Sequence, residues 1–405
     1  MPNTVLQRRV VRTLASAQVL NGVGTTVTVA AGSLLVSSIT DSETLAGLAQ
    51  TSAVLGAAAL AIPLARLTAR GGRRLALSVG NTCGAIGSIF AILGGAHRNL
   101  FLMLLGTFLV GAASAAGYQA RFAAIDLATN ETRAKQLSFV VWGSTIGAVA
   151  GPNLMDPAGN IAELFNLPRL VGPYLVSATS LLFATIVIQI FLRPDPYLTA
   201  EKQANVVQHK GSAKVALAHI RSNPKALFAI SSIAIGHVAM VSVMVMTPIH
   251  MKHVDVSLRI IGFVISVHVL GMFAFSPIVG ALSDRLGRMR VIQIGLVILL
   301  ASTVVAGTAA AGDAVKLGIG LFLLGLGWSC TLIAGSALLS ESVSIEMRPA
   351  SQGASDLVMN LSGAGGGVVA GVIIGTISYG WLCLFAAIPA LVLGVFSIKL
   401  ARVGS

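Results

Sequence analysis

The segment 280–290 reads Gly280-Ala281-Leu282-Ser283-Asp284-Arg285-Leu286-Gly287-Arg288-Met289-Arg290 and lies between two long apolar runs. Its glycines permit a tight turn and a close approach of the helices on either side. Asp284 can pair with a nearby arginine or lie at a helix N-terminus, where the helix dipole favours negative charge. We interpret the segment as a charge latch, formed by Gly280, Asp284, Arg285, Gly287 and Arg288, that closes in one conformation and opens in another. The alternative is a basic loop that only fixes membrane topology.

Apolar runs like the two around this segment recur along the whole chain. Hydrophobic residues make up 55% of the 405 residues and charged residues 10%, whereas an average soluble chain is about a quarter charged. A run of about 20 apolar residues crosses the hydrocarbon core as a helix, because lipid leaves no water to satisfy exposed backbone groups. The sequence therefore predicts an all-α membrane protein with twelve transmembrane helices, near 14–38, 45–65, 74–95, 99–122, 136–155, 171–192, 226–249, 259–282, 291–311, 316–340, 353–377 and 380–401.

The basic residues are distributed unevenly between the two sides of these spans. Of the 27 Lys and Arg residues, 22 fall on one side and five on the other. Positive charge favours the cytoplasmic side, so both termini are expected in the cytoplasm of a bacterial cell, with the chain crossing the inner membrane many times. The net charge of +13 is then a topological signal, and we expect the lipid bilayer and not nucleic acid as the partner.

A polar stretch at 193–225 divides the spans six and six. We expect one bundle at 1–192, a cytoplasmic linker loop at 193–225 and a second bundle at 226–405. The first half repeats the latch segment in degraded form, as Ala65-Arg66-Leu67-Thr68-Ala69-Arg70-Gly71-Gly72-Arg73-Arg74. Ala69 stands where the second copy has Asp284, so a latch based on the carboxylate is expected in the second half only.

The segment 280–290 resembles the signature loop of the major facilitator superfamily, G-x-L-[AS]-D-R-x-G-R-[KR], apart from Met289. The resemblance implies two pseudo-symmetric six-helix bundles that work by alternating access. It also implies a binding site near the midplane, between the halves. Gly143, Gly147 and Gly151 in the fifth span partly match a glycine-rich motif of drug/proton antiporters in this family. We favour the simpler interpretation that small residues at every fourth position let helices pack closely.

Methionine and histidine concentrate in the seventh and eighth spans. Residues 237–272 hold five of the eleven methionines and four of the seven histidines. Helical spacing places His237, Met240 and Met244 on one face, and places His268 and Met272 on another. If the two spans form an antiparallel hairpin, these groups face one another, and three more residues at its turn could collect an ion at the outer mouth: His250, Met251 and His253.

Thioether and imidazole ligands together suit Cu(I) better than calcium, magnesium or manganese. The pairs Met240–Met244 and His268–Met272 also resemble the MxxxM and HxxxM pairs of CcoA-like bacterial copper importers. Two other interpretations stay open. The cluster could handle an organic substrate or a proton without metal, or the methionines could simply fill gaps between helices.

Five further charged residues lie near the cytoplasmic ends of the fourth, fifth, tenth and eleventh spans. They are Arg121, Asp126, Arg133, Glu341 and Asp356. We expect either a gating network of salt bridges that breaks on opening, or ordinary solvated loop charges.

The leading prediction is a monomeric transporter that imports Cu(I) into the cytoplasm, with copper as substrate and with no cofactor. The alternative is a proton-coupled transporter of a small organic molecule, either a drug exporter or an importer of a vitamin or metabolite. A non-transporting membrane sensor is a second alternative, and nothing in the sequence indicates an enzyme. No Asp or Glu falls in the middle of a predicted span, so proton coupling would rest on His237 or His268; otherwise the protein is a uniporter.

Overall fold

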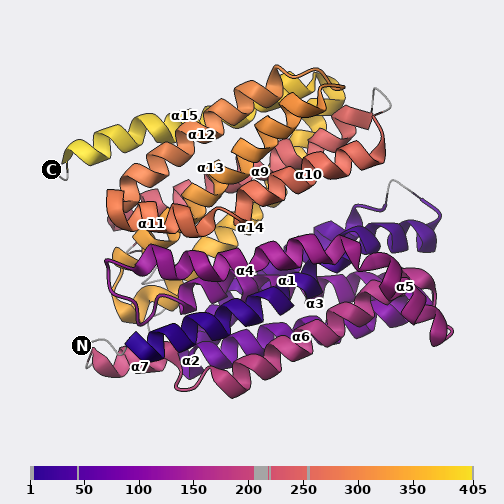
Figure 1. Ribbon diagram of the computed structural model, residues 1–405, viewed down its shortest axis with the longest axis horizontal. Coiled ribbons are helices and arrows are strands. Elements are labelled where there is room, and N and C mark those ends of the chain that lie inside the picture. The colour runs from indigo at the N-terminus through magenta and orange to yellow at the C-terminus, as the bar shows by residue number, and fades with distance from the viewer. Residues whose placement is uncertain (1–3, 43–44, 205–217, 219, 253–255, 404–405) are drawn as a thin grey trace. The chain divides into compact units, whose positions relative to one another are not determined.

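The computed structural model describes residues 4–42, 45–204, 218, 220–252 and 256–403. All regular structure in these ranges is helical, as Figure 1 shows. Ten helices are long and apolar enough to cross a membrane, and the bent pair Arg133–Gly151 and Met155–Leu164 adds one more span. One of the ten, Leu48–Ala96, consists of two helices joined at the non-helical Gly72, each about 36 Å long against a hydrocarbon core of about 30 Å, so this stretch crosses twice. The predicted all-α architecture with twelve spans is confirmed.

The helix bounds follow the predicted spans closely. The helices are α1 (Thr4–Thr40), α2 (Leu48–Ala96), α3 (Leu100–Ala123), α4 (Arg133–Asn153), α5 (Met155–Leu164), α6 (Gly172–Phe191), α7 (Pro196–Gln203), α9 (Pro224–Lys252), α10 (Leu258–Phe273), α11 (Ser276–Leu286), α12 (Arg288–Gly307), α13 (Ala314–Glu341), α14 (Arg348–Thr376) and α15 (Tyr379–Val403), with short 3₁₀ turns η1 (Arg169–Val171) and η2 (Ile345–Met347). Helices α5 and α7, and the break that divides the eighth span into α10 and α11, were not predicted from the sequence.

The chain forms two compact units. Unit 1 comprises residues 1–129, 139–213 and 345–357, and unit 2 comprises 130–138, 214–344 and 358–405. Each unit thus contains a short segment that the sequence places in the other half. The first of these segments begins α4 and the second begins α14, so both helices start in one unit and continue in the other. The division into bundles at 1–192 and 226–405 stays a prediction.

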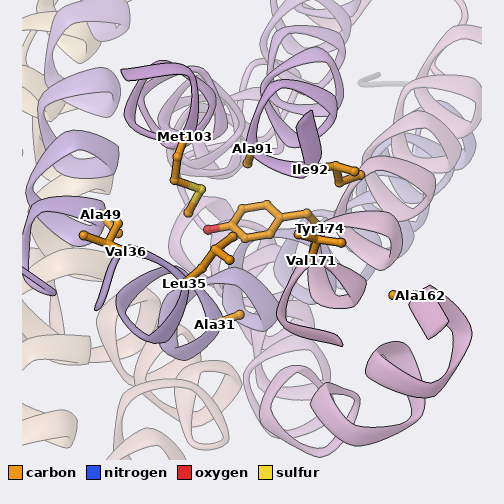
Figure 2. Close-up of a cluster of buried hydrophobic side chains, with 10 residues drawn as sticks. All are labelled: Ala31, Leu35, Val36, Ala49, Ala91, Ile92, Met103, Ala162, Val171 and Tyr174. Atoms are coloured by element: carbon orange, nitrogen blue, oxygen red, sulfur yellow. The ribbon is translucent and has the colours of Figure 1, made fainter. Parts of the chain in front are cut away.

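The described part of unit 1 packs through small residues and through apolar clusters, of which one is large. Figure 2 shows the ten buried side chains of the larger cluster, which come from α1, α2, α3, α5, η1 and α6, with Leu35 and Met103 beside the ring of Tyr174. Ala162 belongs to this cluster, which explains why the short helix α5 packs back onto the bundle. On the other side of α1, Gly147 of α4 lies against Gly22, and Thr26 donates a hydrogen bond to the carbonyl oxygen of Gly147 at 2.8 Å. The glycines of the fifth span therefore pack helices together.

Unit 2 is organised around α13, whose apolar window is 78% buried. Helices α9, α10 and α12 all pack against α13, while α9 and α10 touch each other only marginally. The seventh and eighth spans are consecutive helices joined near residues 253–257, as expected. The expected packing of one against the other is not found, because both pack mainly against α13. A helix as uniformly apolar as α13 can be covered on every side.

Candidate functional site

Each repeated segment contains a glycine at which a helix is interrupted: Gly72 within α2 and Gly287 after α11. Gly72 has φ = 82° and Gly287 has φ = 92°, a backbone region that residues with a Cβ rarely adopt. The two glycines occupy the same place in the internal repeat. In each copy the next residue is an arginine, Arg73 or Arg288, that enters a network of charged groups.

In unit 2, Asp284 lies at the N-terminus of α4. Its two carboxylate oxygens accept hydrogen bonds from the backbone N–H groups of Ala134 at 3.0 Å and Lys135 at 2.8 Å. Arg288 contacts the same carboxylate at 2.9 Å. Gly280, one turn before Asp284, lies against the carbonyl of Ala134, where a Cβ would come within 2.7 Å of the oxygen. The carboxylate therefore satisfies two backbone donors of α4 that have no partner within the helix.

Arg288 extends this contact to α13 and to the segment before α4. Its guanidinium bonds Glu341 at 2.8 Å and the carbonyl oxygen of Asn130. Arg133 also lies 3.5 Å from Glu341. These contacts bring together Asp284, Arg288, Arg133 and Glu341, all named from the sequence, whereas Arg285 is exposed on the surface of α11. We name this set of four the unit 2 network.

We expect Asp284→Ala to weaken the attachment of α4 to α11. The change removes a capping carboxylate, a loss of about 1–2 kcal/mol of unfolding free energy by analogy with other N-terminal caps. The measurement is the thermal unfolding midpoint of the purified protein in detergent, with Ala69→Ser in the other repeat as the matched control. An unchanged midpoint for Asp284→Ala would contradict this role.

In unit 1, Arg73 makes the corresponding contacts. It donates two hydrogen bonds to Asp126, at 2.7 and 3.1 Å, and a third to the side-chain oxygen of Gln352 at 2.6 Å. Both charged side chains are 1% exposed. Asp195 accepts a hydrogen bond from the backbone N–H of Arg74 at 2.7 Å. The first repeat therefore holds its arginine firmly even though Ala69 replaces the aspartate.

A second ion pair in unit 1 joins Arg121 to Asp356 at 2.5 Å, with side-chain exposures of 2% and 0%. The ring of Phe122 lies 4.5 Å from the Arg121 guanidinium. Burying two charges is costly unless they are paired and hydrogen bonded. We name Arg73, Asp126, Gln352, Arg121 and Asp356 the unit 1 network. Through Gln352 and Asp356 it attaches the start of α14 to α2 and α3.

The histidines of the sulfur-rich region are held at different levels of α13. Trp328 donates its indole N–H to Nδ1 of His237 at 3.2 Å, while Nδ1 of His268 lies 2.8 Å from the carbonyl oxygen of Leu321. Leu321 and Trp328 are seven residues apart, about 10 Å along a helix. The structure therefore does not bring His237 and His268 together around one ion.

The other candidate ligands are placed as follows. Met240 and Met272 are buried and Met244 is half-buried. His250 stacks on the ring of Tyr379 with centroids 4.3 Å apart. Met251, the next residue, is buried. His253 lies outside the described residues. No group of three or more His, Cys, Asp or Glu side chains suited to a metal ion occurs within the described ranges.

The sequence did not predict the roles of three residues: Arg73 and Gln352 in the unit 1 network, and Trp328 as the partner of His237. The repeat carries the signal for Arg73, since it aligns with Arg288. No local signal identifies Trp328 as the partner of His237, because 91 residues separate them.

The chain is similar to known membrane proteins over most of its length. A model described as Major Facilitator Superfamily matches residues 14–255 and 229–403. The chain is 35% identical to the uncharacterized MFS-type transporter YdeG of Bacillus subtilis, over 96% of this chain and 91% of that protein. It is 27% identical to the riboflavin transporter RfnT of Brucella anthropi, over 89% and 87%. Among solved structures, the Escherichia coli fucose:proton symporter FucP superposes with a TM-score of 0.74 at 15% identity, covering 96% of this chain and 98% of that one.

Proposed function

The chain belongs to the Major Facilitator Superfamily, and from that premise we propose that it carries a small organic solute across the bacterial inner membrane by alternating access, coupled to protons. The observation that carries the proposal is the pair of repeat-related networks. Arg73 and Arg288 occupy equivalent places, and each holds a segment that the sequence assigns to the other half. Such contacts can break and re-form as a unit, which is what a gate requires.

The distribution of basic residues supports the orientation. The network arginines belong to the side that carries 22 of the 27 Lys and Arg residues. By the positive-inside rule we place both networks and both termini at the cytoplasmic face. A closed state of the networks then blocks the cytoplasmic exit, and we propose that the protein works as a monomer, because each unit completes its own network.

Polar side chains inside unit 1 support an organic substrate. Gln18 donates a hydrogen bond to Ser144 at 3.0 Å, and Asn21 donates to Asn81 at 2.7 Å. Gln18 and Ser144 are half-buried. Amides and hydroxyls can match the donors and acceptors of a neutral heterocycle. No Asp or Glu of the described ranges lies in the middle of a span, so an organic cation would find no counter-charge. Together with the 27% identity to a riboflavin transporter, this favours flat, polar, uncharged molecules such as riboflavin.

Proton coupling is assigned to His237. It lies near the middle of α9 and is 8% exposed, whereas His268 is fully buried. An imidazole is the side chain that changes charge near neutral pH without a strong perturbation. With carboxylates restricted to the ends of the described spans, His237 is the best-placed group to take up a proton.

Cu(I) import is the second candidate. His268 Nε2 is buried and has no hydrogen-bond partner within the described part of the chain, and Met272 follows on the same helix face. A neutral imidazole nitrogen and a thioether are suitable Cu(I) ligands. Against copper stands the separation of His237 from His268 along α13. The resemblance to copper importers therefore stays a prediction.

One experiment distinguishes these candidates. Purified protein in proteoliposomes is given radiolabelled riboflavin or reduced radiolabelled copper, with and without an inward proton gradient. We expect riboflavin uptake that the gradient accelerates and that His237→Gln uncouples from it. His97→Gln, in the loop after α2, is the matched control and should behave as the wild type. Uptake of copper alone would overturn the organic-solute proposal in favour of the second candidate, and uptake of neither would refute both substrates.

A further inference from the structure

The hydrogen bond between Trp328 and His237 lies deep in the membrane. His237 is the 14th of 29 residues in α9, and Trp328 is the 15th of 28 in α13. The two rings are tilted by 41° with centroids 6.3 Å apart. Gly363 of α14 completes the enclosure, because a Cβ there would lie 2.6 Å from the His237 ring. Trp328 itself is 3% exposed.

The chemistry of this bond fixes the charge state of the histidine. An indole nitrogen can only donate, so Nδ1 of His237 must accept. A neutral imidazole can do this when its proton is on Nε2. An imidazolium carries protons on both nitrogens and offers no acceptor. The observed bond therefore requires neutral His237, and a proton on Nδ1 would place two donors against each other.

Trp328 also contacts the break in the eighth span. Its indole meets the ring of Phe273 edge to face, with centroids 5.7 Å apart, and Phe273 is the last residue of α10. The next residue of α13, Ser329, lies 3.3 Å from Ser276, the first residue of α11. Helix α11 ends in the latch segment and carries Asp284. The same turn of α13 thus contacts His237 on one side and the start of the latch helix on the other.

We propose that Trp328 is a positioning residue. Its indole takes one position when His237 is neutral and another when His237 is protonated, and this change alters the contacts at the break between α10 and α11. This rests on the proposed proton coupling through His237. When His237 takes a proton, the indole N–H loses its acceptor and must move. Its edge contact with Phe273 then changes, and with it the support of α11. A proton bound near the middle of α9 would therefore change the packing of α11, the helix whose Asp284 accepts hydrogen bonds from the start of α4.

Other ionisable groups on the helices around α9 are few. Within the membrane they are His250 on α9 itself, His268 on α10, Cys330 on α13, and Tyr379 and Cys383 on α15. Charged groups occur at the helix ends, as with Glu341 and Arg288. His268, the other buried histidine of the described spans, serves as the comparison group in the test.

The test uses the full chain with Trp142 and Trp381 replaced by Phe, so that Trp328 is the remaining tryptophan. Its fluorescence is titrated in proteoliposomes without any transported solute. We expect the emission to shift between high and low pH, because protonation of His237 removes the acceptor of the indole N–H. His237→Gln should abolish the shift and His268→Gln should retain it. Emission that does not change with pH, or that changes equally in His237→Gln, would overturn the proposal.

A second readout separates positioning from mere packing. Arg285→Cys, in a chain without its native cysteines, places a thiol on the exposed surface of α11. We expect its reaction with a water-soluble maleimide to change severalfold between high and low pH. Trp328→Phe keeps an aromatic ring at this position but lacks the N–H donor, so the pH dependence should disappear while the protein stays folded. A dependence that survives Trp328→Phe would refute the role. Neither readout involves a transported molecule, so failure of riboflavin uptake would leave both results interpretable.

Discussion

Asp356→Ala is expected to lower the unfolding free energy by about 3–5 kcal/mol, which is the usual cost of removing one partner of a buried ion pair. Arg121 is 2% exposed and lies 2.5 Å from this carboxylate. Without it, the guanidinium charge loses its closest compensating group in a site that water does not reach. The measurement is the thermal unfolding midpoint in detergent, monitored by the ultraviolet absorbance of the protein or by the fluorescence of a thiol-reactive dye.

The double variant Arg121→Leu, Asp356→Leu sharpens the result. Replacing both members of a buried pair by apolar residues is often close to neutral, so the double variant should be more stable than Asp356→Ala. The matched control is Arg169→Ala, which removes an exposed pair with Asp156 and should leave the midpoint nearly unchanged. If the double variant is as unstable as the single one, the loss is one of packing and the charge argument fails. Because the pair attaches the start of α14 to α3, both variants should also lose transport.

Gly147→Val is expected to displace α4 from α1 and to produce the other large loss. Even a Cβ at this position would lie 2.5 Å from the carbonyl carbon of Gly22 and 2.6 Å from the backbone nitrogen of Val23. Backbone atoms cannot move aside as a flexible side chain can. Overpacking of this kind costs about 1–3 kcal/mol for small insertions. We expect Gly147→Val to lower the unfolding free energy more than Gly147→Ala does.

The measurement is again the unfolding midpoint, with Gly394→Ala in α15 as the matched control. Apart from its own turn of α15, no atom of the described residues lies within 4 Å of a Cβ built on Gly394, and replacing a helical glycine by alanine reduces the entropy of the unfolded chain. That variant should be as stable as the wild type or slightly more so. Equal midpoints for Gly147→Ala and Gly394→Ala would show that the α1–α4 crossing tolerates a wider separation.

Much of the fold could be predicted from the sequence because the membrane imposes a simple rule. Each span needs about 20 apolar residues and internal hydrogen bonding, so hydropathy alone located the twelve spans. The repeated loop carried further information, since Gly72 and Gly287 proved to share the same unusual backbone conformation. Local signals of this kind survive without knowledge of the tertiary structure.

The site was harder to predict, for a physical reason. Arg121 and Asp356 are 235 residues apart, and no periodicity within either helix identifies the other as its partner. The close packing assumed between the seventh and eighth spans is not found, because adjacency in sequence does not fix adjacency in a helical bundle, and both helices pack mainly against α13. Methionine and histidine are concentrated in these spans, yet the two buried histidines, His237 and His268, are hydrogen bonded to different levels of α13.

Residues 345–357 belong to unit 1 although they are synthesised late, and this affects the order in which the protein assembles. A ribosome adds about 5–20 residues per second, so Arg121 waits roughly 10–50 seconds before Asp356 has been synthesised. During that interval the inserted first half holds a guanidinium whose carboxylate does not yet exist. The early spans must therefore leave it in contact with water or headgroups, and they close around it only when the eleventh span arrives. The last steps of synthesis complete the core of the first unit.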